Sequence, residues 1–159
     1  MPRVEHAIEI HAAPDRVFAM VANNPERMPD WWESFELQQR VTPPPTEVGS
    51  VSRYVYNMMG VKIKGEHRVI DLKPGEYLLV QTTSGIEATF EFRFAPCASG
   101  GDPPHTQLTI SVDYALPGAM LGKLLNRLTM EQKNERDLQH ALLLLKALIE
   151  SQVITPTPS

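Results

Sequence analysis

Hydrophobic and polar residues alternate along most of the chain between residues 6 and 114, which is the pattern of β-strands with one face in a core. The pattern is clearest from Ile86 to Phe94, where every second residue is apolar. Turn-forming residues such as Pro74 and Gly75 separate the runs. We therefore predict strands at residues 6–11, 36–41, 49–57, 61–71, 77–83, 86–94 and 107–114.

Two short helices are predicted directly after the first strand. The first begins at Pro14, because a proline suits the first position of a helix, and its apolar residues then recur at helical spacing. Asn24 is expected to cap the second helix, which starts at Pro25. Pro29 is expected to cut that helix short, since a proline ring is poorly tolerated in a helix interior.

Three large aromatic residues, Trp31, Trp32 and Phe35, follow this break within five residues. Side chains of this size must find apolar surface to cover them. They predict either an ordinary corner of the core or the wall or lid of a pocket, and the two interpretations are compatible.

A long helix is predicted from about Ala119 to Ile149. Its apolar residues recur at helical spacing and form one stripe: Leu121, Leu124, Leu125, Leu128, Leu138, Leu142, Leu145 and Ile149. In the middle of the helix the same face is expected to present Glu131, Gln132 and Glu135.

This order of elements predicts an α+β fold. Strands joined by short turns form an antiparallel sheet, and a single long helix must cover its apolar face. A curved sheet of six to seven strands wrapped around one helix leaves space between the two. Pockets commonly form in such concavities.

Composition narrows the classes of function. The chain has 159 residues, 42% of them hydrophobic, and a net charge of −4. This suits one domain, predicted at residues 1–152 with a tail at 153–159, and gives no basic footprint for nucleic acid. No apolar run approaches the ~20 residues that span a bilayer. Cys97 is the single cysteine, so no intramolecular disulfide is expected and a cytoplasmic location is the default.

Two segments carry a resemblance to a known family. IHAAPDRVFAMVANNPERMPDWWESF at the front and LPGAMLGKLLNRLTMEQKNERDLQHALLLLKALIE at the back resemble the START/SRPBCC helix-grip superfamily. The chain is most similar to its bacterial polyketide cyclase/dehydrase and lipid-transport group and to coenzyme-Q-binding relatives. The resemblance covers essentially the whole chain and implies a deep apolar cavity between the sheet and the long helix.

The resemblance also implies catalytic candidates. Aromatase/cyclases of this fold use a cavity arginine on a middle strand and a tyrosine near the short helices. His67 and Arg68, in KGEHRVID, resemble the stretch that carries the arginine, while Phe35 stands at the tyrosine position and has no hydroxyl. Strand alternation directs His67 toward the cavity and Arg68 toward solvent, unless a β-bulge inverts the local pattern.

The candidate ligand-binding residues combine apolar walls with a few polar groups that would orient a ligand. They are Trp31, Trp32, Phe35, Tyr54, Tyr56, His67, Gln81, Phe90, Phe92, Leu121, Leu125 and Glu135. No pair of histidines has the tight spacing of a metal motif, and no glycine-rich phosphate loop is present, so we expect no metal and no cofactor.

Three functions remain open from the sequence. The leading hypothesis is a non-catalytic carrier or sensor that binds a lipid, a quinone or a polyketide-like aromatic. The alternative is an aromatase/cyclase that uses Arg68 or His67 to polarise a carbonyl. The third is an interaction module, which would need an exposed apolar patch. A homodimer stays an open alternative for the oligomeric state.

Overall fold

The computed structural model describes residues 3–58, 60–97, 105–115 and 127–154, with side chains described as far as residue 151 except for residues 127–130. Seven antiparallel strands form one sheet with the order β1-β7-β6-β5-β4-β3-β2. The strands are β1 (Arg3–Ile10), β2 (Phe35–Arg40), β3 (Val51–Met58), β4 (Val61–Lys73), β5 (Tyr77–Thr82), β6 (Glu87–Pro96) and β7 (Thr106–Ala115). Every strand expected from the alternation is present.

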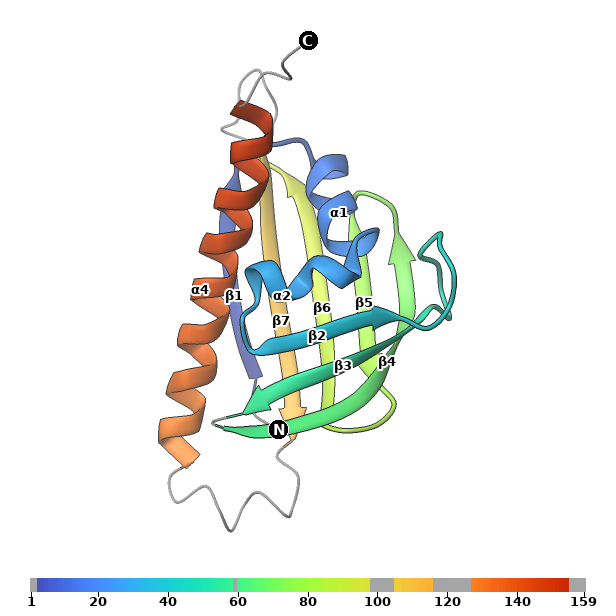
Figure 1. The fold of residues 1–159 in the computed structure, drawn as a ribbon. Coiled ribbons are helices and arrows are strands. Elements are labelled where there is room, and N and C mark those ends of the chain that lie inside the picture. Colours follow the sequence, from blue (N-terminus) through green and yellow to red (C-terminus); the bar gives the residue numbers. More distant parts are fainter. Residues whose placement is uncertain (1–2, 59, 98–104, 116–126, 155–159) are drawn as a thin grey trace.

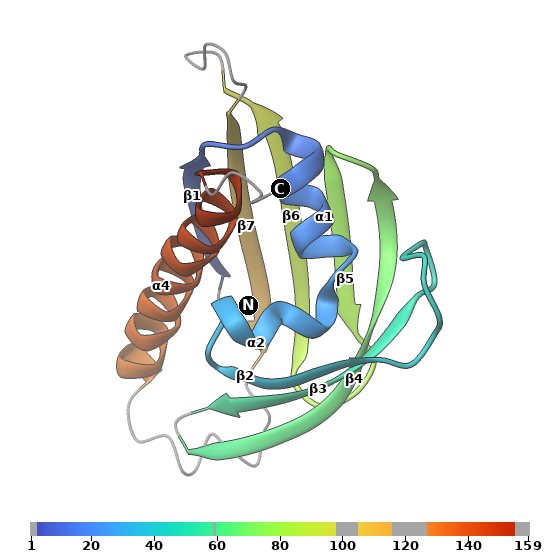
Figure 2. The ribbon, with the colours of Figure 1, turned by 45° about the horizontal axis from the view of Figure 1, so that its top comes forward.

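The sheet curls around the helices on its concave side (Figures 1 and 2). The long helix α4 (Arg127–Ile154) lies beside β1, and the short helices lie inside the curve of the sheet. This is the expected α+β helix-grip fold. None of the helices in the described chain is both long enough and apolar enough to cross a membrane.

Three short helical segments follow β1: α1 (Pro14–Ala22), the single turn η1 (Pro25–Arg27) and α2 (Met28–Trp31). Asn24 stands at the N-cap of η1, directly before Pro25, as expected, but its side chain does not cap that turn: its Nδ2 donates to the carbonyl of Ala19 at 2.9 Å and closes the end of α1. The expected role of Pro29 is wrong. It stands in the first turn of α2, where a missing N–H costs nothing, so it helps to start a helix rather than to end one.

The helix α4 buries one stripe of side chains against the sheet. Leu138, Leu142, Leu145 and Ile149 are all fully buried, as predicted. The expectation for the middle of the helix is wrong, because Glu131, Gln132 and Glu135 are exposed. The inward face continues from Leu138 back to Asn134, one helical turn earlier, rather than to these three residues.

The concave face of β4 is set by strict alternation. Gly65, His67 and Val69 are buried, whereas Lys64, Arg68 and Ile70 are exposed. A bulge does interrupt the pairing with β5, but it lies between Val69 and Asp71, beyond Arg68. The alternation of inward and outward side chains therefore holds through His67 and Val69, the residues of β4 that line the cavities.

Candidate ligand-binding cavity

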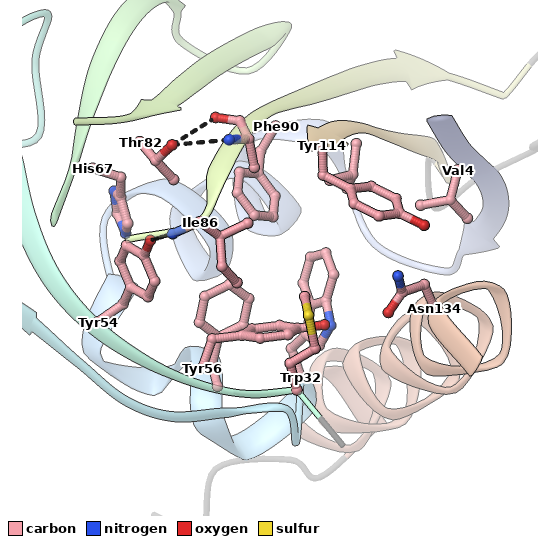
Figure 3. Close-up of a pocket in the computed structure, with 14 residues that line it drawn as sticks. Val4, Trp32, Tyr54, Tyr56, His67, Thr82, Ile86, Phe90, Tyr114 and Asn134 are labelled. Atoms are coloured by element: carbon pink, nitrogen blue, oxygen red, sulfur yellow. Dashed lines mark hydrogen bonds between the residues drawn. The ribbon is translucent and has the colours of Figure 1, made fainter. Parts of the chain in front are cut away.

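Two neighbouring cavities lie between the concave face of the sheet and the helices. The first is lined mainly by aromatic and aliphatic side chains from all seven strands, by Trp32 and by Asn134 of α4 (Figure 3). The second lies toward α1 and is lined by Val21, Met28, Gln38, Leu78 and Phe92 among others. In each, the volume open to a water-sized sphere is about 40 Å³. Each cavity therefore has room for only a few water molecules.

Three side chains form the partition between the two cavities. Phe35, His67 and Phe90 line both of them. The Phe35 and Phe90 rings have centroids 6.0 Å apart, and Trp32 packs against both at 5.3 Å and 5.8 Å. These three side chains therefore lie between the two spaces.

His67 is the most unusual polar residue of the cavity. Its Nε2 lies 2.9 Å from Oε1 of Gln38, and Nε2 of Gln38 donates to the carbonyl of Pro25 at 3.0 Å. The Gln38 amide is thereby oriented with its oxygen toward the ring, so Nε2 of His67 must carry the proton. Burial lowers the pKa of His67 from the usual 6.5 to about 4, so the ring is neutral near pH 7.

The second ring nitrogen of His67 has no partner. Nδ1 is buried and makes no hydrogen bond within the described chain. With the proton on Nε2, Nδ1 presents a lone pair and can only accept. A buried polar atom without a partner costs about 1–3 kcal/mol, so this position is unusual unless a bound molecule completes it.

Tyr54 stacks on His67 but its hydroxyl is already committed. The two rings have centroids 5.8 Å apart at 22°. The Tyr54 hydroxyl donates to the carbonyl of Ser84 at 2.8 Å and accepts from the N–H of Ile86 at 2.9 Å. Its ring lines the cavity, while its hydroxyl holds the turn between β5 and β6 (Figure 3).

Tyr56 lies farther along the same wall. Burial, with the carboxylate of Asp137 nearby, raises the pKa of Tyr56 well above its usual range. Asp137 itself accepts from Ser34 at 3.0 Å and from Lys133 at 2.7 Å. Ser34, Lys133 and Asp137 line a third, polar groove of about 280 Å³. This groove shares Trp32 with the first cavity. Trp32 therefore separates the apolar interior from this groove.

The structure brings together most of the predicted ligand-binding residues. Trp32, Phe35, Tyr54, Tyr56, His67 and Phe90 line the first cavity, and Phe92 lines the second. Trp31 is buried beside Trp32, with ring centroids 5.8 Å apart, but lines neither cavity. Leu121 and Leu125 lie outside the described residues.

Three predicted residues point elsewhere. Gln81 is exposed on the outer face of β5, opposite Arg68. Glu135 has a side chain that is 60% exposed and faces Nε2 of His6 at 3.6 Å. Arg68 is exposed on the outer face of β4, as the strand alternation predicted, and lines neither cavity. The reason is the period of the strand, which turns its side chain away from His67.

Sequence reasoning missed several polar residues of the cavity walls, among them Asn134, Gln38 and Thr82. Asn134 could have been found by extending the buried stripe of α4 back by one turn from Leu138. Gln38 and Thr82 gave no signal of their own, because a polar residue on a strand is normally read as solvent-facing. Thr82 is held by Ala88, to whose carbonyl its hydroxyl donates at 3.2 Å.

Several solved structures share this architecture. TTHA0849 from Thermus thermophilus is 19% identical with a TM-score of 0.76, covering 95% of this chain and 99% of that one. The Zhui aromatase/cyclase from Streptomyces sp. R1128 is 18% identical with a TM-score of 0.75, covering 99% of both. A START superfamily protein from Mycobacterium smegmatis is 16% identical with a TM-score of 0.65, covering 94% and 98%.

At these identities the structures show a shared fold and no more. No curated protein matches the sequence. The family model described as polyketide cyclase / dehydrase and lipid transport, however, matches residues 1–150, which is nearly the whole chain. The chain therefore belongs to the polyketide cyclase/dehydrase and lipid transport family.

Proposed function

We propose that the protein binds a hydrophobic small molecule between the sheet and α4, as a non-catalytic carrier or sensor. Lipids, quinones and polyketide-like aromatics are the candidate classes. The observation that carries the proposal is the unpartnered Nδ1 of His67 in a cavity wall made mainly of aromatic and aliphatic side chains. Apolar burial would supply most of the affinity, at roughly 25 cal/mol per Å² before the costs of association.

The cavity must adapt to accept such a ligand. Ligand pockets commonly have volumes of about 300–1,000 Å³, far more than the space left open in either cavity. Movement of Phe35 or Phe90 would merge the two, and Met28 and Met58 on their walls have flexible side chains that repack easily. Trp32 is placed to act as the gate, since it faces both the interior and the polar groove.

His67 selects among the candidate ligands. Because Nδ1 can only accept, the ligand that completes it carries a hydroxyl or another hydrogen-bond donor. A phenol, an enol or an alcohol satisfies this need, whereas a quinone whose only polar groups are carbonyls leaves Nδ1 unpaired. The proposal therefore favours hydroxylated aromatics or hydroxylated lipids over simple quinones.

Native mass spectrometry of the protein purified from its own cells tests the proposal. We expect a bound small molecule that carries at least one hydroxyl. A protein that is consistently empty, and that ignores a panel of hydroxylated aromatics, lipids and quinones, would contradict it. The single cysteine, Cys97, fits a reducing, cytoplasmic setting, so a cytosolic fraction is the proper source.

A cyclase-type enzyme is the second candidate. The similarity in fold to an aromatase/cyclase and the cavity position of His67 favour it. With Arg68 outside, His67 is the remaining catalytic candidate, and its free Nδ1 could act only as a base, because it has no proton with which to polarise a carbonyl. A base whose conjugate acid has a pKa of about 4 is a poor proton acceptor near pH 7, where catalytic bases have pKa values closer to the working pH. The carrier therefore remains the stronger proposal.

An interaction module has less support. The exposed large hydrophobic residues of the described chain are Leu37, Val41, Val48, Ile70 and Leu143. They belong to β2, the connection after it, β4 and α4, so no single element presents an apolar docking face.

A further inference from the structure

Four side chains of types that commonly bind metals lie close together where β1 ends and the neighbouring strands begin or end. This cluster is outside the cavity. The paired part of β1 and β7 ends with Ile10 opposite Thr106, and that of β6 and β7 ends with Pro96 opposite the same residue. One residue further, His11, His105 and Cys97 stand in a row across three neighbouring strand ends. The N–H of Cys97 donates to the carbonyl of His105 at 3.0 Å, which continues the ladder to this row.

Glu9 lies two residues before His11. Its side chain is therefore on the same face of the chain as that of His11 and close to this row. One of its carboxylate oxygens, Oε1, lies 3.5 Å from Nε2 of His11 and 3.2 Å from Nδ1 of His105. The potential ligand atoms of these three residues all lie within 4.8 Å of one another. The other oxygen, Oε2, accepts from the Cys97 thiol at 3.5 Å.

The two imidazoles stack on each other beside Glu9, so one ring must turn before the in-plane lone pairs of both can meet on one ion. The His11 and His105 rings stack with centroids 4.1 Å apart and an angle of 14° between planes. Each directs one nitrogen at the same oxygen of Glu9. A divalent metal binds imidazole in its neutral form together with an ionised carboxylate.

We propose that Glu9, His11, His105 and Cys97 form a binding site for a divalent transition metal, with Zn²⁺ as the representative ion. Ligand atoms lie 2.0–2.3 Å from Zn²⁺ in tetrahedral sites, so neighbouring ligand atoms are roughly 3–4 Å apart. The distances around Glu9 already fall in this range. Imidazole, carboxylate and thiolate are together the ligands of a zinc or cobalt ion rather than of calcium or magnesium.

A further carboxylate stands behind one of the imidazoles. Oε2 of Glu150 on α4 lies 4.0 Å from Nδ1 of His11, and it accepts from the backbone N–H of His11 at 2.9 Å. Histidines that bind metals usually turn their second nitrogen toward such a group. Glu150 is in turn held by Lys146, which also donates to the carbonyl of Glu9 at 2.7 Å.

A metal here would tie together segments that are distant in the sequence. Glu9 belongs to β1, His11 to the connection before α1, and Cys97 and His105 to the ends of β6 and β7. The ends of β1 and α4 lie close together in Figure 1, on the side away from the β3–β4 turn. The site is thus structural or regulatory, and it is separate from the ligand cavity.

Zinc titration of the untagged full chain, followed by calorimetry, tests the proposal. We expect one Zn²⁺ per chain and a melting temperature that rises with zinc. His11→Ala, His105→Ala and Glu9→Gln should each weaken binding by more than about tenfold, since even outer partners of a metal site are typically worth that much. His140→Ala is the matched control, because His140 is exposed and faces one carboxylate, that of Glu33, at 3.4 Å.

Cobalt spectroscopy examines the thiol separately, on the wild type and on Cys97→Ser. Co²⁺ should give tetrahedral absorption bands and a thiolate charge-transfer band that Cys97→Ser removes. Zinc binding that the three ligand variants leave unchanged, or that His140→Ala weakens equally, would overturn the site. A cobalt complex without the thiolate band would overturn the assignment of Cys97 as a ligand.

Discussion

Nε2 of His67 lies 2.9 Å from Oε1 of Gln38, and this contact fixes which nitrogen of the buried ring is free. Gln38 is itself oriented by its donation to the carbonyl of Pro25. A chain of two hydrogen bonds from the short helices thus leaves Nδ1 of His67 as an acceptor without a partner in the described chain. The chemistry expected of the ligand follows from this arrangement.

Gln38→Leu should destabilise the protein by about 1–3 kcal/mol, because it leaves the buried N–H of His67 without an acceptor. Urea unfolding followed by circular dichroism measures the change. Gln39→Leu is the matched control, since Gln39 is the next residue of β2 and is exposed. Equal losses from the two substitutions would show that the contact between Gln38 and His67 contributes nothing specific.

The pH dependence of stability should carry a signature of His67. Its pKa is about 4 when folded and about 6.5 when unfolded, so between these values the unfolded chain binds the extra proton. Stability from this residue is complete above about pH 6.5 and is lost as the pH falls toward about 4, by about 3 kcal/mol in all.

His67→Leu should remove that part of the pH dependence. Unfolding free energies of the wild type and the variant, measured across the same pH range, give the difference directly. A His67 ring that titrates near pH 6.5 in the folded protein by NMR would rule this prediction out.

Phe90→Ala should join the two cavities. We expect a loss of about 2–4 kcal/mol in stability, together with a greater capacity for hydrophobic ligands. Phe94→Ala is the matched control: Phe94 is buried on the same face of β6, but it packs against Phe18 at 5.2 Å and lines neither cavity. Binding of a hydrophobic fluorescent dye compares the two, and an equal uptake would refute the partition.

Gly65→Ala should be severely destabilising. A Cβ at this position would lie 2.2 Å from the carbonyl oxygen of Ser84 and 2.6 Å from the hydroxyl of Tyr54. The substitution would break the contact that fixes the β5–β6 turn, at a cost of about 3 kcal/mol or more. Gly60→Ala meets open space and pays only for its positive φ of 90°, about 1–2 kcal/mol. Thermal melts that rank these two in the opposite order would contradict the account.

The fold could be predicted from the sequence because its strands alternate so regularly. The same period of two directs His67 inward and Arg68 outward, and the burial of each agrees. The errors were local ones. Asn24 and Pro29 each have two compatible roles near a helix end, and the choice between them depends on where the next segment packs.

The candidate site was harder to predict because it depends on register. The partnership of Gln38 with His67 requires β2, β3 and β4 to pair in one alignment, which no local pattern specifies. The approach of His11 to His105 likewise follows from the pairing of β1 with β7, whose residues are distant in the sequence. The apolar stripe of α4 predicts Glu135 on the cavity side, yet one position of helical rotation places Asn134 there instead.

The most direct measurement is a calorimetric titration with naphthol and with its methyl ether, on the wild type, His67→Leu and Arg68→Ala. We predict that the wild type binds naphthol roughly three- to tenfold more tightly than the ether, the worth of one hydrogen bond to Nδ1. His67→Leu should lose this preference, and Arg68→Ala, changed on the outer face, should keep it. Failure of the wild type to bind either compound, or a preference that survives in His67→Leu, would contradict the central claim.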